Sequence, residues 1–400
     1  MSERRSRRRF LKTTTSLLVG GSLLATAAPS SAADAAETWP QVGYDAQNTG
    51  YAPENSGPAA DVEREWTFDG AELNSPPVVG NRTLYATGSD GVFAISTTDG
   101  TKQWRKTFTE LPSAPAISGE TLYVGTGKQQ SQHGEFYALD ATTGSERWSV
   151  SRVYEGFNTP TVYSDTVFTG TYGGNASLFA FAASGDNTRW RRRSDGAVTR
   201  PAVTASTIYH GESPATLRSL SQGAGESQWH KRIMTELSPP SVGGSSVFVG
   251  DGTYGTVYAV NEDTGDERWH SNPVPERTYA RVNGAPSIAD GTLYVGVAHD
   301  GGGSIVALSP DGTPRWRYDT AGGVVSAPVI AGAVLYAGDT NGNLYGLSPK
   351  TGETYWNYSL ESAVTSSPVI ADGQLYLVTG DGGHAFTGSP TPPTPSPSPS

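Results

Sequence analysis

The feature that most constrains the fold of this chain is a short phrase that recurs along it. A glycine stands four positions before a tryptophan in TTDGTKQW (residues 97–104), ATTGSERW, EDTGDERW and PKTGETYW. The tryptophans aligned with this phrase are spaced by 38 to 47 residues: Trp66, Trp104, Trp148, Trp190, Trp229, Trp269, Trp316 and Trp356. A period of this size predicts copies of one structural unit, each docking on the next.

Two further markers give the same count. A proline that follows small or polar residues and precedes apolar ones occurs eight times: Pro77, Pro115, Pro160, Pro201, Pro240, Pro286, Pro328 and Pro368. After each proline comes an apolar residue followed by an aromatic one, as in Leu84-Tyr85 and Val167-Phe168. Because three markers each count eight, the sequence predicts eight units over residues 62–387.

Each unit has the pattern of four short strands. The proline strand is followed by a turn, the apolar–aromatic strand, a Gly-rich loop, a third strand such as VYAVN, a Thr-Gly turn and the tryptophan strand. Asp90-Gly91 and Asn341-Gly342 stand where hairpins need residues that tolerate positive φ. Four antiparallel strands in about forty residues are typical of a propeller blade. We therefore predict an all-β fold, an eight-bladed β-propeller of four-stranded antiparallel blades.

The positions of the first and last markers predict how the ring closes. Trp66 comes before the first proline strand, whereas the last unit, residues 366–386, ends without a tryptophan phrase. The simplest explanation is that residues 62–68 supply the outer strand of the last blade. This arrangement joins the chain ends and leaves no edge strand exposed between the first and last blades.

In these repeated units the chain resembles the pyrroloquinoline-quinone (PQQ) repeat family, whose blades carry the pattern A-x-D-x-x-T-G-x-x-x-W. ALDATTGSERW, residues 138–148, follows the pattern fully, and the third and fourth units follow it least. Residues 34–61, with WPQVGYDAQNTGYAP from Trp39, resemble the lead-in found before such propellers. The resemblance implies that the repeated tryptophans pack against neighbouring blades in a girdle.

The family includes quinoprotein dehydrogenases, which hold PQQ and a calcium ion in the centre of the ring, and non-enzymatic BamB-like propellers. The chain contains no cysteine, whereas the dehydrogenases commonly stack the quinone on an adjacent cysteine pair. Its six histidines lack metal-ligand spacing, and no stretch matches the calcium-binding or catalytic carboxylate motifs. We therefore predict no catalytic, cofactor-binding or metal-binding residues, and a binding or scaffold role. The alternative is a PQQ- and calcium-dependent dehydrogenase.

Departures from the repeat are the remaining indications of a site. The two positions before each proline are mostly Ser, Ala or Pro, but Asn158 and Arg200 are larger and polar. Arg218 and His384 replace the usual Tyr, Phe or Ala of the third strand. These four residues are predicted to contact the central channel or its mouth, although drift in a tolerant repeat would explain them as well.

Both ends of the chain carry segments that are not expected to fold with the ring. SRRRFLK, with Arg7 and Arg8, precedes an apolar run at residues 16–28 and resembles a twin-arginine export signal over residues 1–33. The apolar run is too short for a membrane span, which needs roughly 20 residues, so no transmembrane segment is expected in the mature chain. Residues 388–400 form a Pro/Ser/Thr-rich tail. We expect an exported, extracellular or cell-surface protein.

Charge narrows the choice of partner. The net charge is −11, and without residues 1–33 the chain would carry 22 basic and 38 acidic residues. Such a surface repels nucleic acid and is typical of a protein adapted to high salt, as in a halophile. The expected partner is a protein or a surface glycan, and the chain is expected to be monomeric. Sequons at Asn81, Asn175 and Asn357 are candidate N-glycosylation sites.

Overall fold

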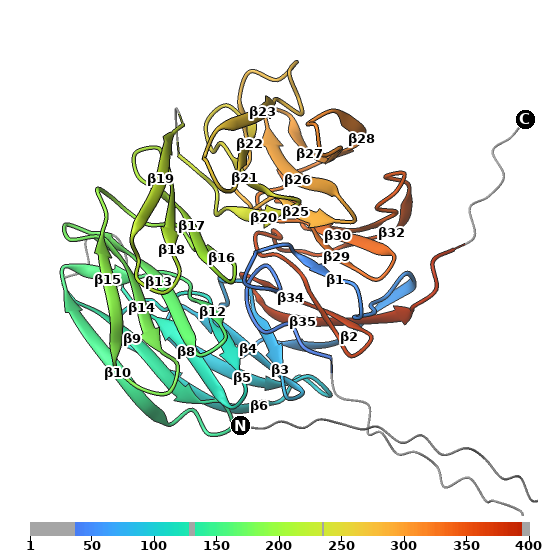
Figure 1. The fold of residues 1–400 in the computed structure, drawn as a ribbon. Helices are drawn as coiled ribbons and strands as arrows, with labels where there is room; N and C mark the ends of the chain where they lie inside the picture. Colours follow the sequence, from blue (N-terminus) through green and yellow to red (C-terminus); the bar gives the residue numbers. More distant parts are fainter. Residues whose placement is uncertain (1–36, 128–132, 234–235, 394–400) are drawn as a thin grey trace, which may run out of the picture. The chain divides into compact units, whose positions relative to one another are not determined.

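The computed structural model describes residues 37–127, 133–233 and 236–393. The predicted export signal, with Arg7 and Arg8, lies outside the described residues, as do residues 394–400 of the predicted tail. The described part is all-β, and it contains no helix that is long and apolar enough to cross a membrane. Its strands form eight sheets that follow one another around a ring in chain order (Figure 1). The predicted eight-bladed propeller is therefore confirmed.

Seven of the eight blades are built from strands that follow one another in the chain, and the last blade takes its outer strand from near the N-terminus. The first four blades contain β3 (Val78–Gly80), β4 (Thr83–Gly88), β5 (Gly91–Ser96) and β6 (Lys102–Thr107); β7 (Ala116–Ser118), β8 (Thr121–Gly125), β9 (His133–Asp140) and β10 (Glu146–Val153); β12 (Thr161–Tyr163), β13 (Thr166–Gly173), β14 (Ser177–Ala182) and β15 (Thr188–Arg193); and β16 (Ala202–Val203), β17 (Thr207–Glu212), β18 (Thr216–Ser221) and β19 (Ser227–Arg232).

The last four blades contain β20 (Ser241–Gly243), β21 (Ser246–Gly250), β22 (Val257–Asn261) and β23 (Glu267–Ser271); β25 (Ser287–Ala289), β26 (Thr292–His299), β27 (Gly302–Leu308) and β28 (Pro314–Thr320); β29 (Val329–Ala331), β30 (Val334–Gly338), β31 (Asn343–Leu347) and β32 (Thr354–Ser359); and β33 (Val369–Ala371), β34 (Gln374–Thr379), β35 (Gly382–Ser389) and β2 (Ala60–Phe68). Three short strands extend these sheets: β1 (Tyr51–Ala52) on β29, β11 (Glu155–Phe157) on β13 and β24 (Ala280–Arg281) on β26.

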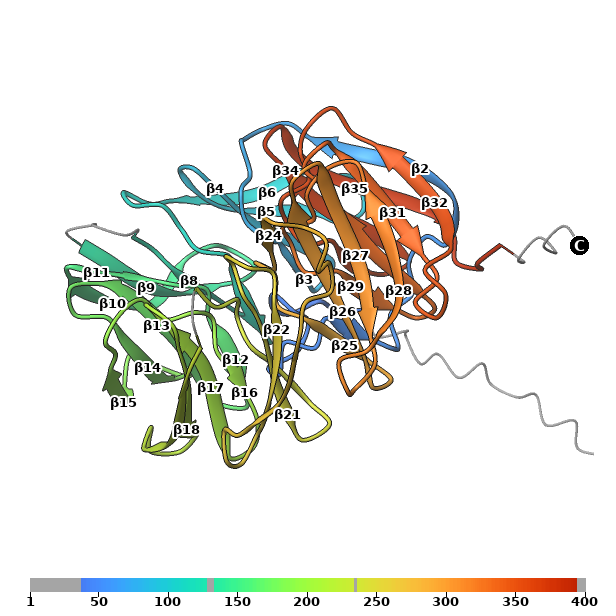
Figure 2. The same cartoon turned by 90° about the horizontal axis from the view of Figure 1, so that it is seen from above.

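Within each blade the proline strand is innermost and the tryptophan strand is outermost, and neighbouring strands are antiparallel (Figures 1 and 2). The first-to-second and third-to-fourth strand turns therefore lie at one end of the ring. The second-to-third strand loops and the connections between blades lie at the other end, which we call the loop end.

The ring closes as the sequence predicts. β2, near the N-terminus, pairs with β35, near the C-terminus, and places Trp66 opposite Ala385. The structure moves one boundary: β35 runs to Ser389, so the first two residues of the predicted tail belong to the last blade. The reason is that Ser389 is itself paired, with Ala60 in the strand register and through its carbonyl oxygen with the Ala59 N–H at 2.6 Å.

Each repeated tryptophan packs on the aromatic residue of its own blade's second strand. The ring centroids lie 5.8–6.1 Å apart in all eight pairs: Tyr85–Trp104, Tyr123–Trp148, Phe168–Trp190, Tyr209–Trp229, Phe248–Trp269, Tyr294–Trp316, Tyr336–Trp356 and Tyr376–Trp66. The pair at the closure matches the other seven, so the last blade is equivalent to the rest.

The tryptophans also dock each blade on the next one. Seven indole N–H groups donate to a carbonyl of the following blade or of the segment just before β2, as from Trp104 to Ala141 at 2.9 Å and from Trp356 to Pro58 at 2.9 Å. The glycine of the next blade's third-to-fourth strand turn lies on the indole. A Cβ there would be 2.6–2.7 Å from the ring in six pairs: Gly100–Trp66, Gly144–Trp104, Gly225–Trp190, Gly265–Trp229, Gly312–Trp269 and Gly352–Trp316. Trp148 contacts Phe181 of the third blade instead.

The lead-in forms a strap across one end of the channel. Residues 39–55, which we call the strap, contact the eight inner strands in chain order, each time at the second residue after the repeat proline. Backbone N–H groups of seven of these residues donate to the strap: Val79, Ile117, Val162, Val203, Val242, Ile288 and Ile330. At the eighth, the Asn55 side chain donates to the Ile370 carbonyl at 2.7 Å. We call this end of the ring the strap end.

Candidate functional site

The centre of the ring holds a cavity of about 310 Å³. The residue before the repeat proline contributes to its lining in all eight blades: Pro76, Ala114, Thr159, Arg200, Pro239, Ala285, Ala327 and Ser367. The rest of the lining is small or uncharged, including Asn158, Thr199, Asn283, Ser326 and Val42 of the strap. Arg200 is therefore the one charged residue among those that line the cavity.

Arg200 connects the cavity wall to the strap. Its side chain is 6% exposed, and its Nη1 donates to the Val42 carbonyl and to Asn48 Oδ1. Asn48 in turn donates to the carbonyls of Pro201, at 3.2 Å, and Pro240, at 2.8 Å. Burial lowers the pKa of Arg200 to about 10, against the opposing influence of the Asp45 carboxylate. The guanidinium thus remains charged at neutral pH and its bonds to the strap hold it in place.

Asn158 also lines the cavity, but its polar atoms are used locally. Its side-chain amide donates to the Val198 carbonyl at 3.0 Å, and its Oδ1 accepts the backbone N–H of Thr159 at 2.7 Å. The structure therefore places two of the four predicted channel residues, Asn158 and Arg200, in the wall of the same cavity.

The other two predicted channel residues do not line this cavity, because the third strand lies two strands away from the axis. Arg218 on β18 is paired with Glu212 at 2.6 Å and with Asp195 at 3.2 Å. His384 on β35 is 1% exposed, and its Nε2 lies 2.9 Å from the Thr379 hydroxyl. Burial lowers the pKa of His384 despite the nearby Asp381.

The cavity lining does not fit the cofactors that the dehydrogenase alternative needs. A calcium ion is bound mainly through carboxylate and carbonyl oxygens, but the lining contains no Asp or Glu. It also contains no aromatic ring on which a planar quinone could stack. Across residues 37–127, 133–233 and 236–393 no group of three or more His, Cys, Asp or Glu side chains is placed to hold a metal ion.

The three sequons occupy different settings. Asn81 is exposed in the turn between β3 and β4, at a φ of 53°. Asn357 is exposed on the outer strand β32. Asn175 is half-buried, and its Oδ1 accepts a hydrogen bond from Arg193 at 3.1 Å. Asn175 is therefore the least accessible of the three.

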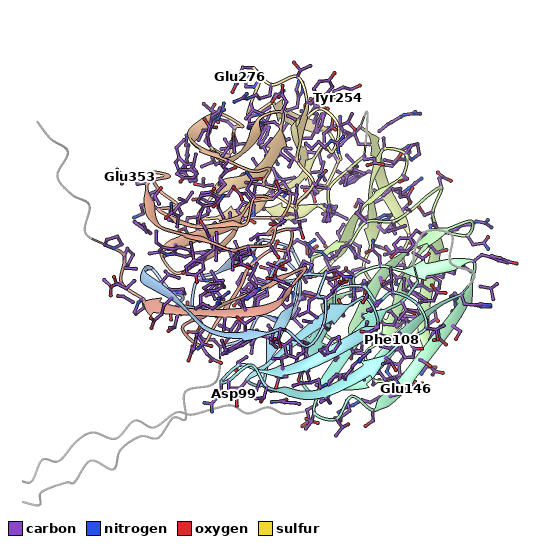
Figure 3. The ribbon with its side chains drawn as sticks, turned by 180° about the vertical axis from the view of Figure 1, so that it is seen from behind. Asp99, Phe108, Glu146, Tyr254, Glu276 and Glu353 are labelled. Carbon is purple, nitrogen blue, oxygen red and sulfur yellow. The ribbon has the colours of Figure 1, made fainter. Side chains whose placement is uncertain are left out.

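Sequence reasoning missed the exposed aromatic residues of the loop end. Among the described residues, the large hydrophobic side chains that are exposed are Val153, Tyr154, Tyr254 and Tyr279, all in loop-end segments. Figure 3 shows Tyr254 at the outer edge of the ring, on the same side of the view as Glu276. Three of these residues are tyrosines, which are enriched in the centres of protein interfaces. The one feature of the sequence that could have indicated these tyrosines is that they lie outside the positions of the repeat markers.

Comparison with known proteins identifies what the chain is similar to. The family model described as "Outer membrane protein assembly factor BamB" matches residues 58–231, 253–348 and 301–388. Outer membrane protein assembly factor BamB of Burkholderia pseudomallei is 25% identical over 356 residues, covering 73% of this chain and 90% of that protein. The match therefore extends over nearly the whole of that BamB.

Two other similarities are more limited. A serine/threonine-protein kinase, AfsK of Streptomyces griseus, is 27% identical over 253 residues, covering 61% of this chain, and the chain spans 26% of the kinase. A solved europium-containing methanol dehydrogenase superposes with a TM-score of 0.72 at 15% identity, covering 87% of this chain and 90% of the dehydrogenase. At that identity the likeness concerns the fold alone.

Proposed function

Since this chain belongs to the family of the outer membrane protein assembly factor BamB, we propose that it is a non-catalytic propeller that acts as a binding or scaffold module. The composition of the central cavity carries the proposal. Its lining offers no carboxylate and no aromatic ring, and its one charged group, Arg200, is bonded to the strap. These features favour a structural role for the centre of the ring and binding through its outer surfaces.

The competing proposal is a PQQ-dependent dehydrogenase. It is supported by the fold shared with methanol dehydrogenase, but a shared fold does not determine a reaction. A dehydrogenase would need groups in the channel to hold a quinone and a calcium ion, and the lining residues do not supply them. We therefore propose no cofactor.

The cellular setting is part of the proposal. The twin-arginine pattern with Arg7 and Arg8 supports export of the folded protein to the cell surface or beyond it. The excess of acidic residues supports adaptation to salt and argues against nucleic-acid partners. A related BamB is named an outer membrane protein assembly factor, which supports a protein partner in preference to a surface glycan.

Reconstitution with PQQ and calcium separates the two proposals. The purified protein is incubated with both, passed through a desalting column and assayed for retained quinone absorbance and for dye-linked oxidation of alcohols and aldehydes. We expect neither retention nor turnover. A quinoprotein dehydrogenase treated in parallel is the positive control, and turnover by this chain above the protein-free background would refute the binding role.

A further inference from the structure

The loop end carries a concentration of positive charge that the proposed function does not yet use. The segment Thr188–Arg193 on β15 contains four arginines in six residues, in a chain whose net charge is −11. Arg189 is paired at the other end of the strand with Asp165, at 2.5 Å, and the remaining three lie toward the loop end. Two of them, with Arg152 of the second blade, border a cavity of about 450 Å³. We call it the arginine cavity, and its lining is Arg152, Val153, Glu155, Asn175, Arg191 and Arg193.

Arg191 is the fixed element of this cavity. Its Nη2 donates to Glu155 at 2.7 Å, and its Nε donates to the Ser177 hydroxyl at 2.9 Å. Glu155 is 3% exposed and also accepts a hydrogen bond from Thr171 at 3.1 Å. The guanidinium of Arg191 lies 5.1 Å from the centre of the Phe179 ring. Glu155, the one carboxylate of the lining, is thus bonded through one oxygen to Arg191 and through the other to Thr171.

The other two arginines have no such partner. Arg152 lies over the same Phe179 ring, at 5.2 Å, and donates to the Ser151 carbonyl. Arg193 donates to the Asn175 side-chain oxygen at 3.1 Å. Within the described part of the chain, neither arginine has a carboxylate within 4.0 Å. The lining therefore has three cations and one anion, an excess of two positive charges around a hollow. Arginines arranged in this way bind carboxylate or phosphate groups through paired N–H donors.

An apolar lip lies beside the charged cavity. Val153 is 53% exposed and Tyr154 is 61% exposed. The backbone at Tyr154 has a φ of 59°, in the left-handed region, and the next residue, Glu155, enters the protein interior. This left-handed conformation is uncommon in a residue other than glycine, and at this point of the chain Tyr154 is exposed while Glu155 is buried. A free inorganic anion would gain nothing from such a lip.

We propose that the arginine cavity and its lip bind an acidic segment of a partner protein. The carboxylates of the segment would contact Arg152 and Arg193, and an apolar side chain of the same segment would pack on Val153 and Tyr154. The proposal rests on the binding role proposed above and adds its location and chemistry. Because the rest of the chain is strongly acidic, it does not attract an acidic peptide. Binding of such a peptide would therefore indicate the arginine cavity.

The probe is a fluorescein-labelled synthetic peptide of repeating Glu-Glu-Phe units, and its binding is measured by fluorescence anisotropy. We expect the double variant Arg152→Gln/Arg193→Gln to bind the peptide about tenfold more weakly than the unmodified protein, a loss of about 1.4 kcal/mol. Arg192→Gln is the matched control. It removes one positive charge, where the double variant removes two, from β15, the strand that carries Arg193. Because Arg192 is exposed and does not line the cavity, the affinity of this variant for the peptide should be unchanged.

Two further measurements distinguish an acidic peptide with an apolar side chain from a simple anion. Tyr154→Ser should weaken the Glu-Glu-Phe peptide several-fold and leave a Glu-Glu-Ser peptide unaffected. Millimolar inorganic phosphate should compete only weakly, whereas complete displacement by phosphate with no difference between the two peptides would make the cavity a simple anion site and overturn the proposal.

Equal affinity of the unmodified protein and the double variant, or no binding to either, would also overturn the arginine cavity proposal. Neither result bears on the binding role, which is tested by turnover after PQQ reconstitution. Circular dichroism of each variant verifies that it is folded at the salt concentration of the assay.

Discussion

At the strap end the blades make nearly the same contacts, whereas the loop end differs from blade to blade. On the strap side, the residue two places after the proline bonds to the strap in all eight blades, and six glycines dock on the indole of the preceding blade. At the loop end lie the exposed tyrosines and the arginine cavity, with no counterpart in the repeat markers. The difference indicates that the repeat encodes the contacts that dock one blade on the next. Loop-end residues that take no part in those contacts are available for binding.

Among the changes that test this difference between the two ends, removal of the strap together with the closing strand is expected to lower stability most. Deleting residues 37–68 removes the outer strand of the last blade and the strap oxygens that accept hydrogen bonds from seven inner strands. The ring would then have an open edge, and we expect Tm to fall by at least about 10 °C or cooperative unfolding to be lost. Calorimetry measures both quantities.

The matched truncation ends the chain at Ser389, after the last residue of β35. It removes a terminal segment but leaves every pairing of the closing strand, so Tm should change by less than about 2 °C. A comparable loss of stability in both truncations would contradict the assignment of closure to β2.

A glycine substitution tests docking at a single blade interface. In Gly265→Ala the new Cβ would lie 2.6 Å from the Trp229 ring, at a φ of 74°. We expect a loss of about 3 kcal/mol in the free energy of unfolding, from overpacking and backbone strain together. Gly244→Ala in the same blade has a similar φ of 57° but no atom within 4 Å of the new Cβ. It should cost about 1 kcal/mol, and equal losses in chemical denaturation would show that docking contributes nothing.

The buried residue His210 predicts a graded pH effect on stability, which reaches the size of the Gly265→Ala effect only at the acid limit. It is 1% exposed, its two ring nitrogens have no hydrogen-bond partner among the described residues, and burial lowers its pKa from 6.5 to about 4. The unfolded chain therefore binds the proton more tightly, so stability is full above pH 6.5 and falls as the pH drops toward 4. The loss should approach about 3 kcal/mol.

The control for this effect is His210→Leu, which has no titrating ring. Its stability should fall less steeply than that of the unmodified protein between pH 6.5 and 4, as measured by urea denaturation. Glu212, 4.0 Å from His210, and Arg218 remain in both proteins, so the difference between the two pH profiles reports His210 together with its interactions with these two groups. Parallel pH profiles would mean that His210 does not carry the effect.

The smallest effect is expected from the exposed tyrosines. Tyr254→Ser and Tyr279→Ser alter side chains that are 59% and 73% exposed, so each should change the free energy of unfolding by less than about 0.5 kcal/mol. If chemical denaturation shows a loss above about 1 kcal/mol in the free energy of unfolding, the exposed tyrosines of the loop end contribute to stability, as the strap-end contacts do.

Much of the fold could be predicted from the sequence because its information is local and repeated. The proline, the aromatic residue and the tryptophan each sit at a fixed place in one unit, so eight copies reveal the strand order and the offset of Trp66 reveals the closure. Less of the candidate site could be predicted. Asn158 and Arg200 deviate from the repeat and do line the cavity, but Arg218 and His384 deviate as much and do not.

The sequence by itself therefore determined the number of blades, the strands within each and the strand that closes the ring. Only the tertiary structure decided the path of the strap, since its partners from Val79 to Ile370 are spread along the chain and meet residues 39–55 only after the ring forms. The same holds for the arginine cavity, where Arg152 of the second blade joins Arg191 and Arg193 of the third. The strap contains no repeat, and Arg152, Arg191 and Arg193 occupy no marker position, so no period in the sequence indicates which residues these contacts bring together.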